Sequence, residues 1–189
     1  MIEYEIKPLI SETEFMQYNS ILNNRIRPTK KLQTNYYFDT LDFQLNSFGN
    51  SLRIRQDVGR LTLQYKYEKQ YTGVEKVCEE FEMVVQALPK CILSKNFPYY
   101  TLNPSLSYGY VGSPITERLG YFYDKAVISK DKSYYWGKCD FELESEFQDY
   151  KIAEEVLVFL AIEKTKIHQI GKYDRSIKEL QELRGRLPN

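Results

Sequence analysis

The sequence is short of the side chains that many hydrolases and zinc proteins use. It has one histidine, His168, so a Ser-His or Cys-His nucleophile system would depend on that single imidazole. Its three cysteines, Cys78, Cys91 and Cys139, form no C-x-x-C pair, which argues against a disulfide framework and against a structural zinc site. The glycine motifs of phosphate loops, dinucleotide folds and nucleophile elbows are also missing.

The sequence also lacks net charge and long apolar runs. Lys plus Arg number 26 and Asp plus Glu number 26, so no overall field attracts nucleic acid or an anionic membrane. The longest clean apolar run, 156–162, is too short to span a bilayer, and the first residues carry no apolar signal segment. We expect a cytoplasmic protein without nucleic-acid or membrane partners, in which any affinity for anions arises locally.

Aromatic residues, in contrast, are abundant. Seventeen tyrosines and ten phenylalanines favour a sheet-rich fold, because aromatic side chains suit a pleated, half-buried surface. A chain of 189 residues with 42% hydrophobic side chains can bury one sizeable core. No low-complexity tract or long linker interrupts it, so we predict a single domain over residues 1–189.

Periodicity predicts the elements. Ser11 and Glu14 form a capping box before a helix over about 12–23. Two alternating runs joined at Asp57-Val58-Gly59 have the signature of a hairpin. Strands are predicted over 2–7, 34–40, 51–57, 60–69, 77–83, 114–123, 124–130 and 137–147; a helical turn over 41–47; helices over 83–93, 152–160 (with Asp149 as N-cap) and 174–187; and a loop-rich tract over 94–112.

The first predicted strand, EYEIK, has one charged face. Glu3, Glu5 and Lys7 recur at every second position, with apolar residues between them. A solvent-exposed face is the ordinary interpretation of such a pattern. The alternative is that the face lines an interior site.

A second strand raises the same alternative more strongly. Glu142, Glu144 and Glu146 line one face of DFELESEF, where like charges repel one another unless a cation lies between them. Carboxylates without histidine or thiolate ligands suit Mg²⁺ or Mn²⁺ rather than Zn²⁺. The pattern indicates either a solvated face or a hard-metal site.

Closure of the strands into a barrel would bring the charged faces together in one interior. Helices outside would then cover the apolar faces, and the charges would point inward. The interior would hold five glutamates and seven bases, a surplus of two positive charges that needs water, metal and an anion to be stable. With one or two Mg²⁺ ions, this surplus would match a linear triphosphate. The residues are Glu3, Glu5, Lys7, Arg53, Arg55, Lys66, Arg118, Glu142, Glu144, Glu146, Lys164 and Lys166.

Seven short motifs, in order, resemble those of the CYTH, or triphosphate tunnel metalloenzyme, superfamily, which joins class IV adenylyl cyclase with thiamine triphosphatase. The resemblance runs over 2–167, is nearest to small single-domain members of Gram-positive bacteria, and leaves 168–189 as a C-terminal helical tail. The motifs are EYEIK (3–7), YYFDT (36–40), LRIR (52–55), LTLQYK (61–66), TER (116–118), DFELESE (140–146) and KTK (164–166).

The resemblance implies an α+β fold, in which an eight-stranded antiparallel β-barrel forms a tunnel with helices packed outside. It also implies a hydrolase that cleaves phosphoanhydride bonds with Mg²⁺ or Mn²⁺. The implied metal ligands are Glu3, Glu5, Glu142, Glu144 and Glu146. The implied catalytic residues are Glu5, Lys7, Arg55 and Glu144. The implied substrate-binding residues are Lys7, Arg53, Arg55, Lys66, Arg118, Lys164 and Lys166.

Several alternatives stay open. The favoured substrate is inorganic tripolyphosphate or another small triphosphate, because no base-reading site is evident; adenylyl cyclase, thiamine triphosphatase and a non-catalytic polyphosphate-binding module are the rivals. Asp39 and Asp131 fit a turn or cap role as well as a tunnel role, and His168 is expected at the surface or rim. The Tyr-rich tract 99–123 could cap the tunnel or mediate a dimer, so the protein is expected to be a monomer or a homodimer.

Overall fold

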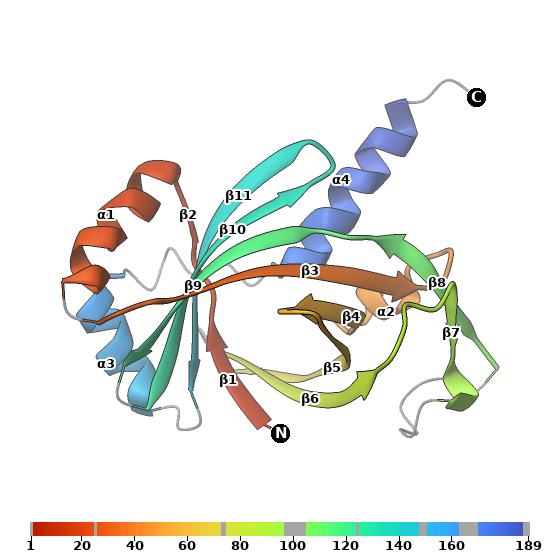
Figure 1. Ribbon diagram of the computed structural model, residues 1–189, viewed down its shortest axis with the longest axis horizontal. Coiled ribbons are helices and arrows are strands. Elements are labelled where there is room, and N and C mark those ends of the chain that lie inside the picture. The colour runs from red at the N-terminus through yellow and green to blue at the C-terminus, as the bar shows by residue number, and fades with distance from the viewer. Residues whose placement is uncertain are drawn as a thin grey trace.

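The computed structural model describes residues 2–24, 26–72, 75–96, 105–123, 125–147, 151–162 and 170–186. Its strands are β1 (Ile2–Ile6), β2 (Leu9–Ile10), β3 (Thr29–Asp39), β4 (Ser51–Asp57), β5 (Arg60–Thr72), β6 (Glu75–Val85), β7 (Cys91–Leu93), β8 (Ser107–Gly112), β9 (Ile115–Tyr123), β10 (Ala126–Tyr135) and β11 (Lys138–Phe147). Its helices are α1 (Glu12–Asn23), α2 (Gln44–Ser47), α3 (Lys151–Leu160) and α4 (Lys172–Arg186), with a 3-10 turn, η1, at Ser94–Asn96 (Figure 1).

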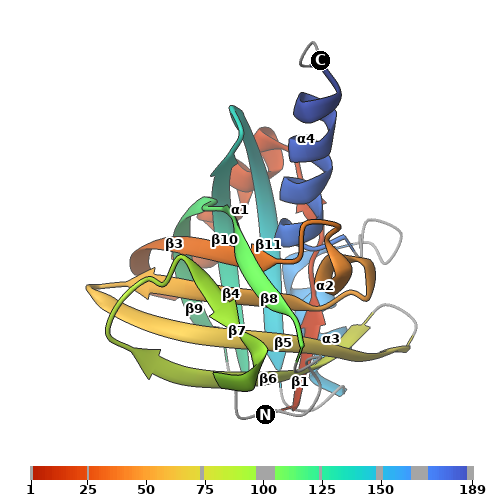
Figure 2. The same cartoon turned by 90° about the vertical axis from the view of Figure 1, so that its right-hand side faces the viewer.

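Eight of these strands close into an antiparallel ring. The order β4-β5-β6-β1-β11-β10-β9-β3 returns to its start because β3 pairs with β4 as well as with β9. Strand β1 completes the ring on the other side, since it pairs with both β6 and β11. The predicted eight-stranded barrel is thereby confirmed. Outside the ring, β2 pairs with β11, and β8 extends along β3 and carries β7 (Figure 2).

The outer faces of the strands are apolar and covered. On one side, Ile128 and Leu143 pack in a core cluster with Leu22 of α1 and with Val156 and Leu160 of α3. This helical cover is the predicted one, and the period-3.6 apolar positions of α3 account for it. No helix among the described residues is long and apolar enough to cross a membrane.

On the other side, strands do part of the covering. Leu52 and Ile54 of β4 are buried with Tyr108 of β8, Ile92 of β7 and Leu45 of α2. Full burial of a side chain such as Leu52 stabilises the fold by roughly 1.5–3 kcal/mol. Strands β7 and β8 therefore cover this side of the ring together with α2.

Two predictions about this region are wrong. The predicted helix over 83–93 does not form, because β6 continues to Val85 in register with β5, and β7 begins at Cys91. The tract 94–112, predicted as loop, contains β8 (Ser107–Gly112). Pairing with β5 and β3 overrides the local pattern in both cases. The predicted N-cap Asp149 lies outside the described residues.

Candidate active site

The inward faces of the ring line a cavity of about 190 Å³. Alternation along each strand produces this lining; Arg53 and Arg55 face inward because Leu52 and Ile54 are buried in the outer cluster. The described charged lining comprises the acids Glu5, Glu80, Glu82, Asp131, Glu142, Glu144, Glu146 and Asp174, and the bases Lys7, Arg53, Arg55, Lys66, Arg118 and Lys172.

The charge balance of this lining differs from the predicted one. Eight acids and six bases make the described part of the cavity acidic, whereas the sequence predicted a basic surplus. Glu80, Glu82 and Lys172 were not foreseen, and two bases of the original count, Lys164 and Lys166, fall in a stretch that the structure does not describe. An acidic lining strengthens the case for a divalent cation, because it needs compensation before it can accept a polyanion.

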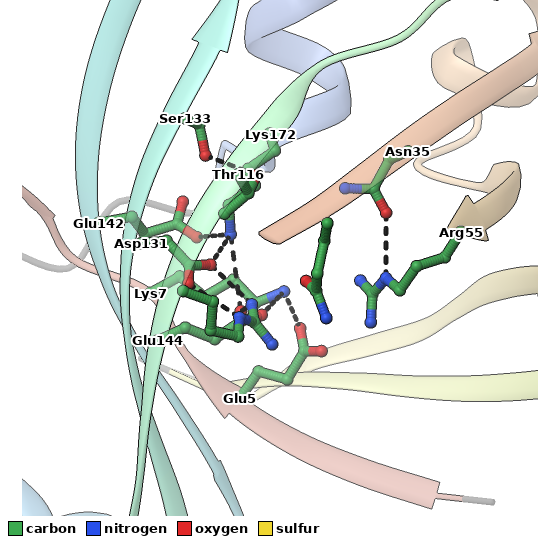
Figure 3. Close-up of polar contacts among 12 residues, drawn as sticks. Glu5, Lys7, Asn35, Arg55, Thr116, Asp131, Ser133, Glu142, Glu144 and Lys172 are labelled. Atoms are coloured by element: carbon green, nitrogen blue, oxygen red, sulfur yellow. Dashed lines mark hydrogen bonds and ion pairs between the residues drawn. The ribbon is translucent and has the colours of Figure 1, made fainter. Parts of the chain in front are cut away.

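Glu5 and Lys7 of the first strand lie at the centre of the cavity. Lys7 Nζ lies 2.6 Å from Glu5 Oε2 and 2.8 Å from Glu144 Oε1 (Figure 3). Lys66 Nζ contacts Glu5 Oε1. Burial opposes ionisation of Glu5, yet the charges of Lys7 and Lys66 outweigh it and lower the pKa of Glu5 to about 2. Glu5 is therefore ionised at neutral pH.

Asp131 lies in the tunnel, which settles one of the open alternatives. Arg118 holds it in a bidentate pair, with Nε 2.8 Å from Oδ1 and Nη2 2.6 Å from Oδ2. Although burial opposes it, the charges of Arg118 and Lys172 lower the pKa of Asp131. Arg118 also contacts Glu144, so it links the two acids. Bidentate geometry fixes the guanidinium plane inside the cavity.

Asp39 has the other role, that of a cap. Its carboxylate accepts hydrogen bonds from the backbone N–H of Leu45 at 2.9 Å and of Asn46 at 3.0 Å, at the start of α2. It also accepts one from the hydroxyl of Tyr173 at 2.7 Å. These bonds occupy both of its oxygens, and Asp39 is not part of the cavity lining.

The two arginines of β4 differ in the groups that balance their positive charge. Arg53 donates to Gln64 Oε1 at 2.7 Å and lies 3.5 Å from Glu80. Arg55 donates to Asn35 Oδ1 at 3.0 Å, and within the described chain it has no ion pair with a carboxylate. Burial, together with the positive charges of Arg53 and Arg118, lowers the pKa of Arg55 to about 10. A guanidinium stays charged at neutral pH, so Arg55 is a cation that an incoming anion would stabilise.

Two groups of carboxylates could hold a metal ion. Ligand oxygens of Glu5, Glu144 and Glu146 lie within 4.8 Å of one another, and so do those of Asp131, Glu142 and Glu144. Burial and the neighbouring charge of Glu144 raise the pKa of Glu146, and among the described residues no cation forms an ion pair with it. Glu5 Oε2 is buried and accepts no well-oriented hydrogen bond. Sites built from carboxylate oxygens alone fit Mg²⁺ or Mn²⁺.

Nine of the predicted site residues line the one cavity; their chemical roles stay predictions. The side chain of Glu3 and the segment carrying Lys164, Lys166 and His168 are not part of the description. The nine are Glu5, Lys7, Arg53, Arg55, Lys66, Arg118, Glu142, Glu144 and Glu146.

Some lining residues could have been found in the sequence and others could not. Glu80 and Glu82 alternate in EEFEM with Phe81 between them, which is the same signal as in the first strand. Lys172 enters the cavity from the first turn of α4, and a helix terminus carries no such periodic signal.

The barrel and its charged interior agree with comparison to known proteins. The chain matches the CYTH domain family over residues 1–173 and belongs to that family. It is 28% identical over 153 residues to YjbK of Bacillus subtilis (strain 168), which is named as a candidate triphosphatase; the match covers 79% of each chain.

Two solved structures share the fold. A candidate adenylate cyclase from Bacillus halodurans superposes with a TM-score of 0.70 at 24% identity, over 90% of this chain and 95% of the other. HpAC1 from Hippeastrum, a candidate adenylyl cyclase described as having a dominant triphosphatase activity, gives a TM-score of 0.71 at 20% identity, over 92% and 95%. At these identities the likeness establishes the fold alone.

Proposed function

We propose that this protein is a divalent-metal-dependent phosphohydrolase that cleaves inorganic tripolyphosphate or a related small triphosphate inside the tunnel. The observation that carries the proposal is that one cavity holds both the Glu5–Glu144–Glu146 group and Arg55, which has no ion pair with a carboxylate among the described residues. In Figure 3, Arg55 lies on the opposite side of the drawn site from Glu144, which belongs to this carboxylate group. A phosphate chain bound to metal at one end and to Arg55 at the other would satisfy both.

The basic side chains would bind and orient the phosphates. Arg53 and Arg55 point inward from β4, and Lys66 points inward from the neighbouring strand β5. Fixed positive groups of this kind stabilise the charge that develops on the phosphoryl oxygens in the transition state. Arg118, oriented by Asp131, would act from the facing strands.

The glutamates would hold the metal. Glu5, Glu144 and Glu146 fit Mg²⁺ or Mn²⁺, which when bound supplies Lewis-acid neutralisation of the phosphate charge. Water would attack the terminal phosphorus in line, and no covalent nucleophile is needed. This is consistent with a chain that has one histidine and three scattered cysteines.

The names of similar proteins support two activities. YjbK is named as a candidate triphosphatase, and HpAC1 is described as having a dominant triphosphatase activity. Adenylate cyclase appears in the descriptions of the Bacillus halodurans and Hippeastrum structures. Cyclisation of ATP is therefore the second candidate. Within the described cavity, the rings of Tyr37 and Tyr173 stack on each other at 4.4 Å and are almost fully buried, so this pair offers no free platform to a nucleobase. Triphosphate hydrolysis remains the first choice.

Other predictions accompany this function. Thiamine triphosphate as substrate, a non-catalytic polyphosphate-binding role, the cytoplasmic location and the monomeric or homodimeric state stay predictions. A binding module would hold the phosphate chain on the same bases without turnover, so catalytic assays separate it from the hydrolase.

Substitution of Arg55 tests the proposal. We expect Arg55→Ala to lower turnover of tripolyphosphate with Mg²⁺ or Mn²⁺ at least tenfold, because it removes a positive group aimed at the phosphates. Glu144→Ala should have a similar effect through the metal. Orthophosphate release measures both. Arg60→Ala, an exposed arginine at the turn of the same hairpin, is the control and should keep full activity. Full activity in both tunnel variants would refute the assignment.

A further inference from the structure

Lys172 places a positive charge inside one of the two carboxylate groups. Its Nζ lies 2.6 Å from Asp131 Oδ2, 2.5 Å from Glu142 Oε1 and 3.5 Å from Glu144 Oε2 (Figure 3). These are the three acids whose ligand oxygens lie within 4.8 Å of one another. An ammonium group has three N–H donors and no acceptor, so it suits a pocket of three carboxylates. Lys172 therefore interacts with the same oxygens that a metal ion would need.

The first turn of α4 fixes Lys172 in this position. Tyr173 donates to Asp39 Oδ2, and Arg175 Nε donates to Asp140 Oδ2 at 2.7 Å. The residue before the helix, Gly171, donates its N–H to Asp174 Oδ2 at 2.9 Å, which closes the helix N-terminus. The side chains of Tyr173 and Arg175 thus anchor the first turn of α4 to β3 and β11, and the side chain of Lys172 is 13% exposed.

Arginines also balance the negative charge of this group. Arg118 pairs with both oxygens of Asp131, and Arg175 Nη2 lies 2.8 Å from Glu142 Oε2. A divalent ion entering here would have to displace an ammonium and pull carboxylates away from two guanidinium groups. Such a displacement leaves buried charges without partners, which is costly.

The second carboxylate group is different. Glu146 makes no hydrogen bond or ion pair with any described residue, and it points into the cavity beside Glu5 and Glu144. Glu5, in contrast, is paired with Lys7 and Lys66, so Glu146 is the member that distinguishes this group from the first. A divalent ion at this group would share Glu5 and Glu144 with the lysines that contact them, but it would gain Glu146, a ligand that has no ion pair with a described residue.

We propose that Lys172 is the resident cation of the Asp131–Glu142–Glu144 group and limits the substrate-free protein to one divalent ion, held by Glu5, Glu144 and Glu146. This inference rests on the proposed function, because it assumes that the tunnel binds a divalent metal. It assigns Lys172 the place that a second metal ion would otherwise take.

The number of Mn²⁺ ions bound without substrate tests this assignment. Isothermal titration calorimetry, with electron paramagnetic resonance of free Mn²⁺ as a second readout, should give one equivalent for the native chain. Lys172→Met should give two, since the three oxygens that the ammonium contacts lose this partner and the group loses one positive charge. Lys172→Arg and the exposed control Lys178→Met should stay at one. A single equivalent for Lys172→Met, or two for the native chain, would overturn the inference.

If Lys172→Met fails to fold, a second variant still tests the proposal. Glu146→Gln removes a buried charge and keeps the shape of the side chain, and we expect it to abolish tight Mn²⁺ binding. One retained equivalent would show that the ion displaces Lys172, which contradicts the proposal.

The stoichiometries also separate the inference from the proposed function. A native chain that binds no Mn²⁺ at all would count against both. One ion in the native chain and one in Lys172→Met would count against the role of Lys172 alone.

Discussion

The environment of Lys130 depends on the face of β10 from which its side chain points. Its neighbour Asp131 points into the tunnel, whereas Lys130 points outward under α1, where it is fully buried. Its Nζ lies 4.0 Å from the centroid of the Phe15 ring and donates to Asn19 Oδ1. Period-two alternation predicts that the two residues lie on opposite faces, yet it cannot predict that the outward lysine is covered by a helix.

Burial lowers the pKa of Lys130 to about 8. A depressed lysine pKa means that the unfolded chain binds more protons between about pH 8 and the ordinary lysine value near 10.4. The free energy of unfolding should therefore rise with pH across this window. Below about pH 8, the destabilisation caused by burying charged Lys130 should be at its full size.

We predict that Lys130→Met raises the stability of the protein at pH 7 and removes this pH-dependent contribution. Urea unfolding at pH 7 and pH 10, compared between native chain and variant, measures it. Lys125→Met, at an exposed position of the preceding turn, is the control and should change little. A variant that is less stable at pH 7 would mean that the Phe15 and Asn19 contacts outweigh the cost of burial.

At the scale of the elements, sequence periodicity predicts a helix or strand correctly where one of its faces is polar and the other apolar. The prediction is wrong where both faces carry polar and apolar residues. The hairpin of β4 and β5 and the helix α1 begin and end close to the predicted residues, because alternation and a capping box specify them locally. The end of β6 and all of β8 were mistaken because their strand character depends on partners distant in sequence, β5 and β3.

Close packing against β8 provides a test at this scale. A Cβ added at Gly112 would lie 2.7 Å from the ring of Trp136, whose position is fixed by a hydrogen bond to Ser176 of α4. A Cβ at Gly109, in the same strand, would meet nothing nearer than 4.0 Å.

We predict that Gly112→Ala destabilises the fold by about 1–3 kcal/mol, as overpacking of a filled site does. Gly109→Ala should be close to neutral. Thermal unfolding of the two variants side by side measures the difference. Equal melting temperatures would contradict the contact between β8 and the turn after β10.

At the scale of the whole molecule, the closed barrel turns separate charged faces into one site. The sequence predicts the barrel and nine lining residues, because each inward strand face is marked by alternation. It mispredicts the charge balance of the described interior, since the acids Glu80, Glu82 and Asp131 were not counted, and Asp131 stands in a run without regular alternation of charge. Which charges face each other across the barrel follows from strand closure, and no local pattern encodes that.

The central claim is that this tunnel hydrolyses small triphosphates with a divalent metal. The most direct measurement is a turnover assay that offers tripolyphosphate, ATP and thiamine triphosphate separately, with Mg²⁺, with Mn²⁺ and with a chelator. Orthophosphate, pyrophosphate and cyclic AMP are resolved as products. We predict that orthophosphate is released fastest from tripolyphosphate and that the chelator abolishes its release. Cyclic AMP with pyrophosphate from ATP as the main reaction, or tight metal-dependent binding without any turnover, would contradict the account.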